Sequence, residues 1–284
     1  MDSNEIPAGA VVVGVDGSRE ANHAIDWAAD QARNEGRDLV LLHAVGTSAA
    51  TVGWMASGGV DPTDYLAETG ALGAATLATA AERAHDAVRS DRIHTLVVRD
   101  DPRNALIQAS GLASTVVVGS RGLGPVRGLL LGSVGAAIAR HSHCPAIVVR
   151  PHHPGRVRRG VLVAVDGTEA SRSVLEFAFR QASERRLPIT AMHAERDPDP
   201  APGDGSLTLA EALAGLAEKY PDVAVARMIL RGSPADAILE HADEMNLVVV
   251  GHGRRSPVDR AFGGSVALGV VEHAQTVVAV VPQG

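Results

Sequence analysis

The chain has 284 residues, enough for two domains of ordinary size, and a formal net charge of −7 at pH 7. With this acidic balance and only 2% aromatic residues it makes a poor platform for nucleic acid, so we expect no nucleic-acid partner. The single cysteine, Cys144, excludes an intramolecular disulfide, no segment is apolar for the length of a membrane span, and the first residues lack the basic start of a signal peptide. We therefore expect a cytoplasmic protein.

The first half opens with a short apolar strand at 11–15, which ends at Asp16. Helical spacing of apolar residues follows over 25–32, and a second apolar strand is predicted at 39–45. After further alternation of helices and strands, an apolar segment at 146–149 closes this half.

The most informative motif follows a Val-rich strand at 115–118. It reads Gly119-Ser-Arg-Gly122, then nine residues, then Gly132-Ser133, and a helix-like stretch comes next. A glycine-rich loop between a strand and a helix can place backbone N–H groups around phosphate oxygens, at the positive end of the helix. The spacing therefore predicts a nucleotide site.

The same order of elements returns in the second half. A strand at 161–165 ends at Asp166, and a strand at 189–195 follows. The glycine frame returns after the strand at 247–250, and an apolar run at 277–281 closes the chain. A repeat of this size indicates two tandem domains of one fold. We place them at 7–151 and 157–284.

Short strands that are apolar on both faces suit a parallel sheet covered by helices on each side. The fold class is therefore α/β: two tandem doubly wound domains, each a five-stranded parallel sheet flanked by helices, with ligands at the carboxyl ends of the strands. Ser18 and Thr168 are predicted to cap the first helix of each half. Pro102 and Pro234 are predicted in first helical turns.

Several kinds of chemistry are excluded or disfavoured. Lys219 is the only lysine and lies beside no glycine loop, which excludes a P-loop NTPase. Neither Ser133 nor Ser265 has a histidine base placed by the sequence, and we see no set of three acidic groups for metal-driven hydrolysis. We expect no enzyme activity beyond weak ATP hydrolysis.

Two further motifs suggest a pyrophosphate loop and a metal site, but each is explained as well by ordinary local structure. The segment Ser57-Gly-Gly-Val-Asp61-Pro62 is similar to the pyrophosphate loop of ATP pyrophosphatases, but it follows the wrong strand and ends in proline, so we interpret it as a flexible loop. The histidines around Cys144, at 141, 143, 152 and 153, cross a helix end and a strand start. Ligands placed in this way need not converge, and we predict no metal site.

Three features together resemble the universal stress protein family, of the ATP-binding type. They are the aspartate after the first strand, the glycine frame, and an ending such as Cys144-Pro145-Ala-Ile-Val-Val149. The resemblance covers both halves. It implies adenine-nucleotide binding at the strand ends and a role in stress adaptation. It also implies edge-to-edge pairing of the last strands, which we place at 146–149 and 277–280 of the same chain.

The resemblance assigns binding roles to matching positions in the first half. Asp16 is expected to accept hydrogen bonds from ribose hydroxyls or the adenine amino group, and the backbone at Val45 to read the base edge. Arg121 and Arg127 are candidate counter-charges, with exposed loop arginines as the equal alternative. The expected residues are Val15, Asp16, Val45, Gly119, Arg121, Gly122, Gly132, Ser133 and Val134.

The second site departs from this pattern. Arg254 occupies the position of the second glycine of the frame. If that glycine has a positive φ, an arginine there destabilises the backbone by roughly 1–2 kcal/mol. Glu195 replaces Val45 at the adenine edge. We therefore expect weaker binding here. The expected residues are Asp166, Gly251, Gly253, Gly264, Ser265 and Val266.

The sequence thus predicts an ATP-binding regulatory protein of the stress response, a homodimer that holds ATP with or without Mg²⁺. One alternative is a slow nucleotide hydrolase or nucleotidyl-transfer enzyme of the related pyrophosphatase-like group. Another is an interaction scaffold with empty sites.

Overall fold

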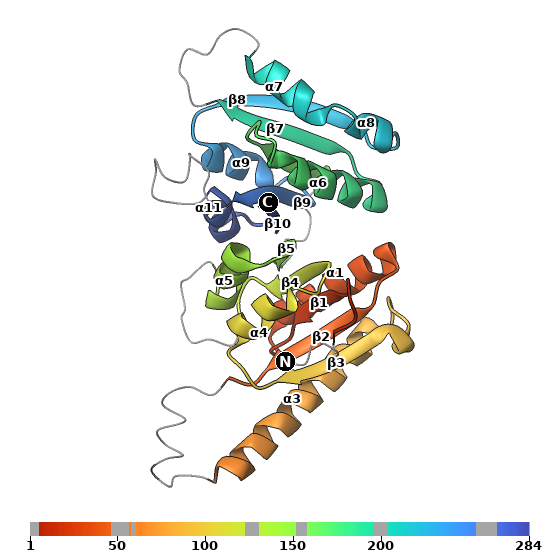
Figure 1. The fold of residues 1–284 in the computed structure, drawn as a ribbon, viewed down its shortest axis with the longest axis vertical. Coiled ribbons are helices and arrows are strands. Elements are labelled where there is room, and N and C mark those ends of the chain that lie inside the picture. The colour runs from red at the N-terminus through yellow and green to blue at the C-terminus, as the bar shows by residue number, and fades with distance from the viewer. Residues whose placement is uncertain are drawn as a thin grey trace. The chain divides into compact units, whose positions relative to one another are not determined.

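The computed structural model describes residues 6–46, 57, 61–122, 131–151, 158–195, 204–253 and 266–283. The chain divides into two compact units, residues 1–144 and 145–284. Each unit is a sheet with helices on both of its faces (Figure 1).

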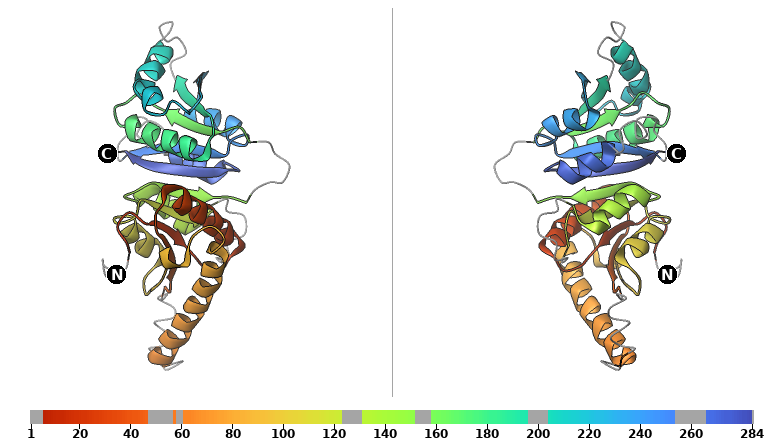
Figure 2. Two further views of the ribbon diagram at one scale, coloured as in Figure 1. Left: turned by 90° about the vertical axis from the view of Figure 1, so that its right-hand side faces the viewer. Right: turned by 90° about the vertical axis from the view of Figure 1, so that its left-hand side faces the viewer.

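In the first unit the described strands run in the order β3-β2-β1-β4, and all are parallel. Helices α1 and α3 pack on one face of this sheet, and α4 and α5 on the other (Figure 2). The elements are β1 (Val11–Gly14), α1 (Arg19–Glu35), β2 (Leu39–Ala44), α3 (Pro62–Ala84), η1 (Ser90–Arg92), β3 (Ile93–Val98), α4 (Pro102–Ala109), β4 (Thr115–Gly119) and α5 (Ser133–His141).

In the second unit the order of the described strands is β5-β10-β9-β6-β7-β8. Helices α6 and α7 cover one face, and α9 and α11 the other. The elements are β5 (Ala146–Val149), β6 (Val161–Val165), α6 (Ser171–Arg185), β7 (Ile189–Glu195), α7 (Asp204–Leu213), α8 (Leu216–Lys219), β8 (Val225–Arg231), α9 (Pro234–Ala242), β9 (Leu247–Gly253), α11 (Val266–His273) and β10 (Val277–Gln283). The fold class is confirmed as tandem α/β with mostly parallel sheet.

The predicted pairing of the two last strands is also confirmed. β5 lies antiparallel to β10, with Val148 opposite Val278 and Ile147 opposite Ala279. All four residues are almost completely buried. An apolar edge strand left unpaired invites aggregation, and this antiparallel pairing covers the edge.

Two of the predicted helix starts are prolines, and both are confirmed, since Pro102 opens α4 and Pro234 opens α9. Ser18 caps α1 as predicted, because its Oγ accepts the Ala21 N–H at 3.1 Å. The prediction for Thr168 is wrong. Helix α6 begins only at Ser171, after Ala170, which makes no side-chain cap.

The longer first half is explained in part by α3, which has 23 residues where the second unit has the 10-residue α7 and the four-residue α8. Asp61 caps α3 by accepting the Thr63 N–H at 2.7 Å, and Pro62 is its first residue. The end of the segment 57–62 is therefore a helix start and not the loop we expected, and residues 58–60 lie outside the described part.

Candidate functional site

A cavity of about 330 Å³ lies at the carboxyl ends of β1 and β4. These neighbouring strands lead into helices on opposite faces of the sheet, which is where α/β folds place their ligands. The volume falls within the range of small-molecule sites. The lining residues are Gly14, Val15, Asp16, Ala21, Leu42, Ala44, Pro102, Leu106, Val118, Gly119, Arg121, Gly122, Leu131, Gly132, Ser133, Val134 and Gly135.

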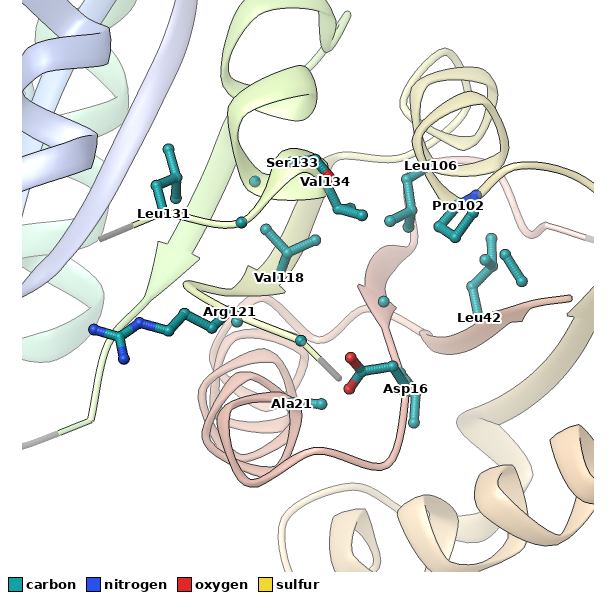
Figure 3. Close-up of a pocket in the computed structure, with 17 residues that line it drawn as sticks. Asp16, Ala21, Leu42, Pro102, Leu106, Val118, Arg121, Leu131, Ser133 and Val134 are labelled. Atoms are coloured by element: carbon teal, nitrogen blue, oxygen red, sulfur yellow. The ribbon is translucent and has the colours of Figure 1, made fainter. Parts of the chain in front are cut away.

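One end of the cavity is apolar. Figure 3 shows Leu42, Pro102 and Leu106 gathered on one side of it, with Val118 beside them. They come from β2, from the first turns of α4 and from β4. A flat aromatic base is the kind of group that such a surface accepts.

The other end is polar, and Asp16 lies at its centre (Figure 3). Its Oδ1 accepts the Ser18 N–H at 2.9 Å, which fixes the carboxylate at the turn after β1. Gly122 approaches the same carboxylate so closely that a Cβ at this position would collide with Asp16 Oδ2. The φ of Gly122 is not positive. Glycine is needed here because the site has no room for a side chain. The strain expected at Arg254 depended on a positive φ at the second glycine of the frame, and in the first half that glycine has no positive φ.

Helix α5 starts at the edge of the cavity. Its N-cap is Gly132, which has no side-chain oxygen, so no side chain caps the first N–H groups of the helix. The N–H of Gly132 donates to Ser120 O at 2.8 Å and holds this turn against the end of β4. Ser133, Val134 and Gly135 line the cavity with a helix N-terminus, where the backbone favours an anion.

Of two further expected residues, Arg121 lines the cavity and Val45 does not. The Arg121 side chain is exposed, and its guanidinium extends away from Asp16 (Figure 3). Val45 is not among the lining residues, and its N–H donates to Val98 O at 2.7 Å, next to the β2–β3 pairing. That N–H is therefore engaged by the neighbouring strand. Arg127 lies outside the described residues.

Sequence reasoning missed the apolar lining residues and one repeated contact. Leu42, Leu106 and Val118 are buried and cannot be told from core by pattern alone. His43 Nδ1 lies 2.7 Å from Val15 O, and His193 Nδ1 lies 2.9 Å from Val165 O. Both histidines hold the strand end before an aspartate. Their matching places in the two strands were the available signal.

In the second half, Asp166 takes hydrogen bonds from its own chain. Its Oδ1 accepts the Thr168 N–H at 3.0 Å, the Thr168 hydroxyl at 2.7 Å and the Ser171 hydroxyl. Burial raises the pKa of Asp166, but the hydrogen bonds from Ser171 and Thr168 outweigh it, so the net pKa lies below the ordinary aspartate value.

The described start of the second glycine frame, residues 251–253, also differs in structure. β4 ends at Gly119, whereas β9 continues through Gly251 to Gly253, where it pairs with Val281 to Gln283 of β10. A Cβ at Gly251 would collide with the Gln283 side chain. The described part of α11 begins at Val266. Arg254, Gly264 and Ser265 lie outside the described residues, as does the side chain of Glu195.

The family model of the universal stress protein family matches residues 8–150 and again residues 158–282. The chain belongs to the universal stress protein family. One such protein of Mycobacterium tuberculosis is 33% identical over 296 residues, which cover 95% of each chain. Another is 33% identical over 293 residues, covering 96% of this chain and 97% of the relative. Because the coverage is nearly complete, the tandem arrangement is shared with these universal stress proteins.

Solved structures agree on the fold. A universal stress protein from Archaeoglobus fulgidus superposes with a TM-score of 0.73 at 23% identity, covering 98% of this chain and 97% of that one. Among the described residues, none of the helices combines the length and the apolar composition that a membrane span requires. Within the same residues, no three His, Cys, Asp or Glu side chains gather as metal ligands would. His152 and His153 lie outside this part of the chain.

Proposed function

We propose that the first half of this universal stress protein binds ATP in the cavity between β1 and β4, and that binding regulates a stress response. The observation that carries the proposal is the composition of one cavity. An apolar end, a carboxylate and an uncapped helix N-terminus surround the same space. Adenine, ribose and phosphate need these three environments.

Each part of ATP has its partner in this proposal. Adenine lies against Leu42, Pro102 and Leu106, the ribose hydroxyls donate to Asp16, and the phosphates meet the N–H groups at Ser133. Mg²⁺ would be held chiefly by the phosphates, as is usual for this hard and well-hydrated ion. The protein supplies binding and orientation.

The proposal also covers the location and the partners of the protein in the cell. We place it in the cytoplasm, in line with its lone cysteine, and take it to be a homodimer that meets a protein partner in its nucleotide-bound form.

Gly122→Glu tests the site. The added carboxylate would meet both Asp16 and the phosphates, so ATP binding should fall below detection in isothermal titration calorimetry. Gly70→Glu is the matched control, because it makes the same change in α3, where a Cβ meets no heavy atom within 4 Å. Unchanged affinity in a folded Gly122→Glu protein would rule the site out.

A further inference from the structure

The two halves can be compared residue by residue around their aspartates. Asp16 and Asp166 each follow the first strand of their half, and each preceding carbonyl contacts a histidine at the same separation in sequence. With this register, Ser171 takes the place of Ala21. Ala21 is buried and lines the cavity of the first half without a hydroxyl.

Ser171 is built into its position. It is the first residue of α6 and is 1% exposed. Its Oγ donates to Asp166 Oδ1 and accepts the Asp166 N–H at 3.3 Å. The N–H and the hydroxyl of Thr168 donate to the same Oδ1. Three donors therefore share one carboxylate oxygen, which offers about two lone-pair sites.

We propose that Ser171 is an intramolecular competitor of the nucleotide, whose hydroxyl, with that of Thr168, takes the place of the ribose hydroxyls at Asp166 and keeps the second half empty. The inference rests on the proposed function of the first half. A nucleotide whose ribose hydroxyls bind Asp166 Oδ1 must displace the part-buried hydrogen bond from Ser171 and leave this serine hydroxyl, on a residue that is 1% exposed, without its acceptor. One ATP therefore binds per chain.

The pairing of β9 with β10 supports the same conclusion. In the second half the residues from Gly251 to Gly253 belong to a strand, and Gln283 lies against Gly251. The backbone that would turn toward a phosphate is held in the sheet instead.

The test is calorimetric titration of the full chain with ATP. The wild type should bind one ATP. The double variant Thr168→Ala/Ser171→Ala, which removes both hydroxyls and the Thr168 methyl group, should bind a second ATP, more weakly than the first because Gly251 to Gly253 stay in the sheet. Ser173→Ala is the matched control and should leave one ATP per chain, because that hydroxyl lies on α6 but bonds to the Ala170 and Pro282 carbonyls.

The reciprocal variant moves the competitor into the first half. Ala21→Ser should weaken ATP binding at least tenfold. A double variant that still binds one ATP, or a wild type that binds two with one lost in Asp166→Ala, would overturn the inference. A wild type that binds no ATP would instead overturn the proposed function. The inference then stands if the double variant Thr168→Ala/Ser171→Ala binds one ATP, and falls if it binds none.

Discussion

Cys144 follows α5 and is almost fully buried beside the start of β5. Burial raises the pKa of its thiol to about 11. At pH 7 only about one molecule in ten thousand then carries the reactive thiolate. A low-pKa redox cysteine needs the opposite environment.

We therefore expect the folded protein to react with iodoacetamide far more slowly than the protein unfolded in urea, by at least a hundredfold. Mass spectrometry of samples quenched over time measures both rates. Equal rates would show that the Cys144 thiol is accessible to solvent in the folded protein, which would contradict its burial in the structure.

At the scale of elements, the start of α5 carries the proposed phosphate contacts. Ser133 is its first residue, where proline is well tolerated, and Gly132 has φ −75° and ψ 158°, which suits a residue before proline. Ser133→Pro should keep the helix while removing one N–H and one hydroxyl from the cavity.

We expect Ser133→Pro to lower ATP affinity about tenfold, with little change in the melting temperature of the nucleotide-free protein. Ser133→Ala, which removes the hydroxyl alone, separates the two groups. Calorimetry and thermal unfolding measure both effects. Full affinity in Ser133→Pro would show that the helix N-terminus does not hold the phosphates.

The elements also show where sequence reasoning works. Val-rich runs predicted the buried strands, because a sheet covered on both faces needs apolar residues on both. Pro102 and Pro234 marked helix starts, since a missing N–H costs nothing there. Thr168 failed as a cap because a hydroxyl can bond its neighbouring aspartate as easily as a helix N–H, and the sequence does not show which.

The site was predictable only in part. Asp16 and the glycines follow from their places at strand ends, and the cavity brings them together with Val15, Ser133 and Val134. The apolar end was missed, because Pro102 and Leu106 look like helix-start and core residues until α4 is placed over β1 and β2. The need for glycine at 122 depends on a contact made through space, which no local pattern shows.

At the scale of the whole molecule, the repeat has produced two different halves. The first has an aspartate beside a cavity, and the second has an aspartate bonded to Thr168 and Ser171. Duplication allows one copy to keep a ligand while the other changes. The domain limits 7–151 and 157–284 stay a prediction, which the separate folding of each fragment would test.

The proposed binding of ATP by the first half alone is tested most directly by locating the bound nucleotide within the whole chain. Native mass spectrometry of the full-length protein titrated with ATP counts the bound molecules in the wild type, Asp16→Ala and Asp166→Ala. We predict one ATP per chain in the wild type and in Asp166→Ala, and at least tenfold weaker binding in Asp16→Ala. Equal losses in the two variants, or a larger loss in Asp166→Ala, would contradict it.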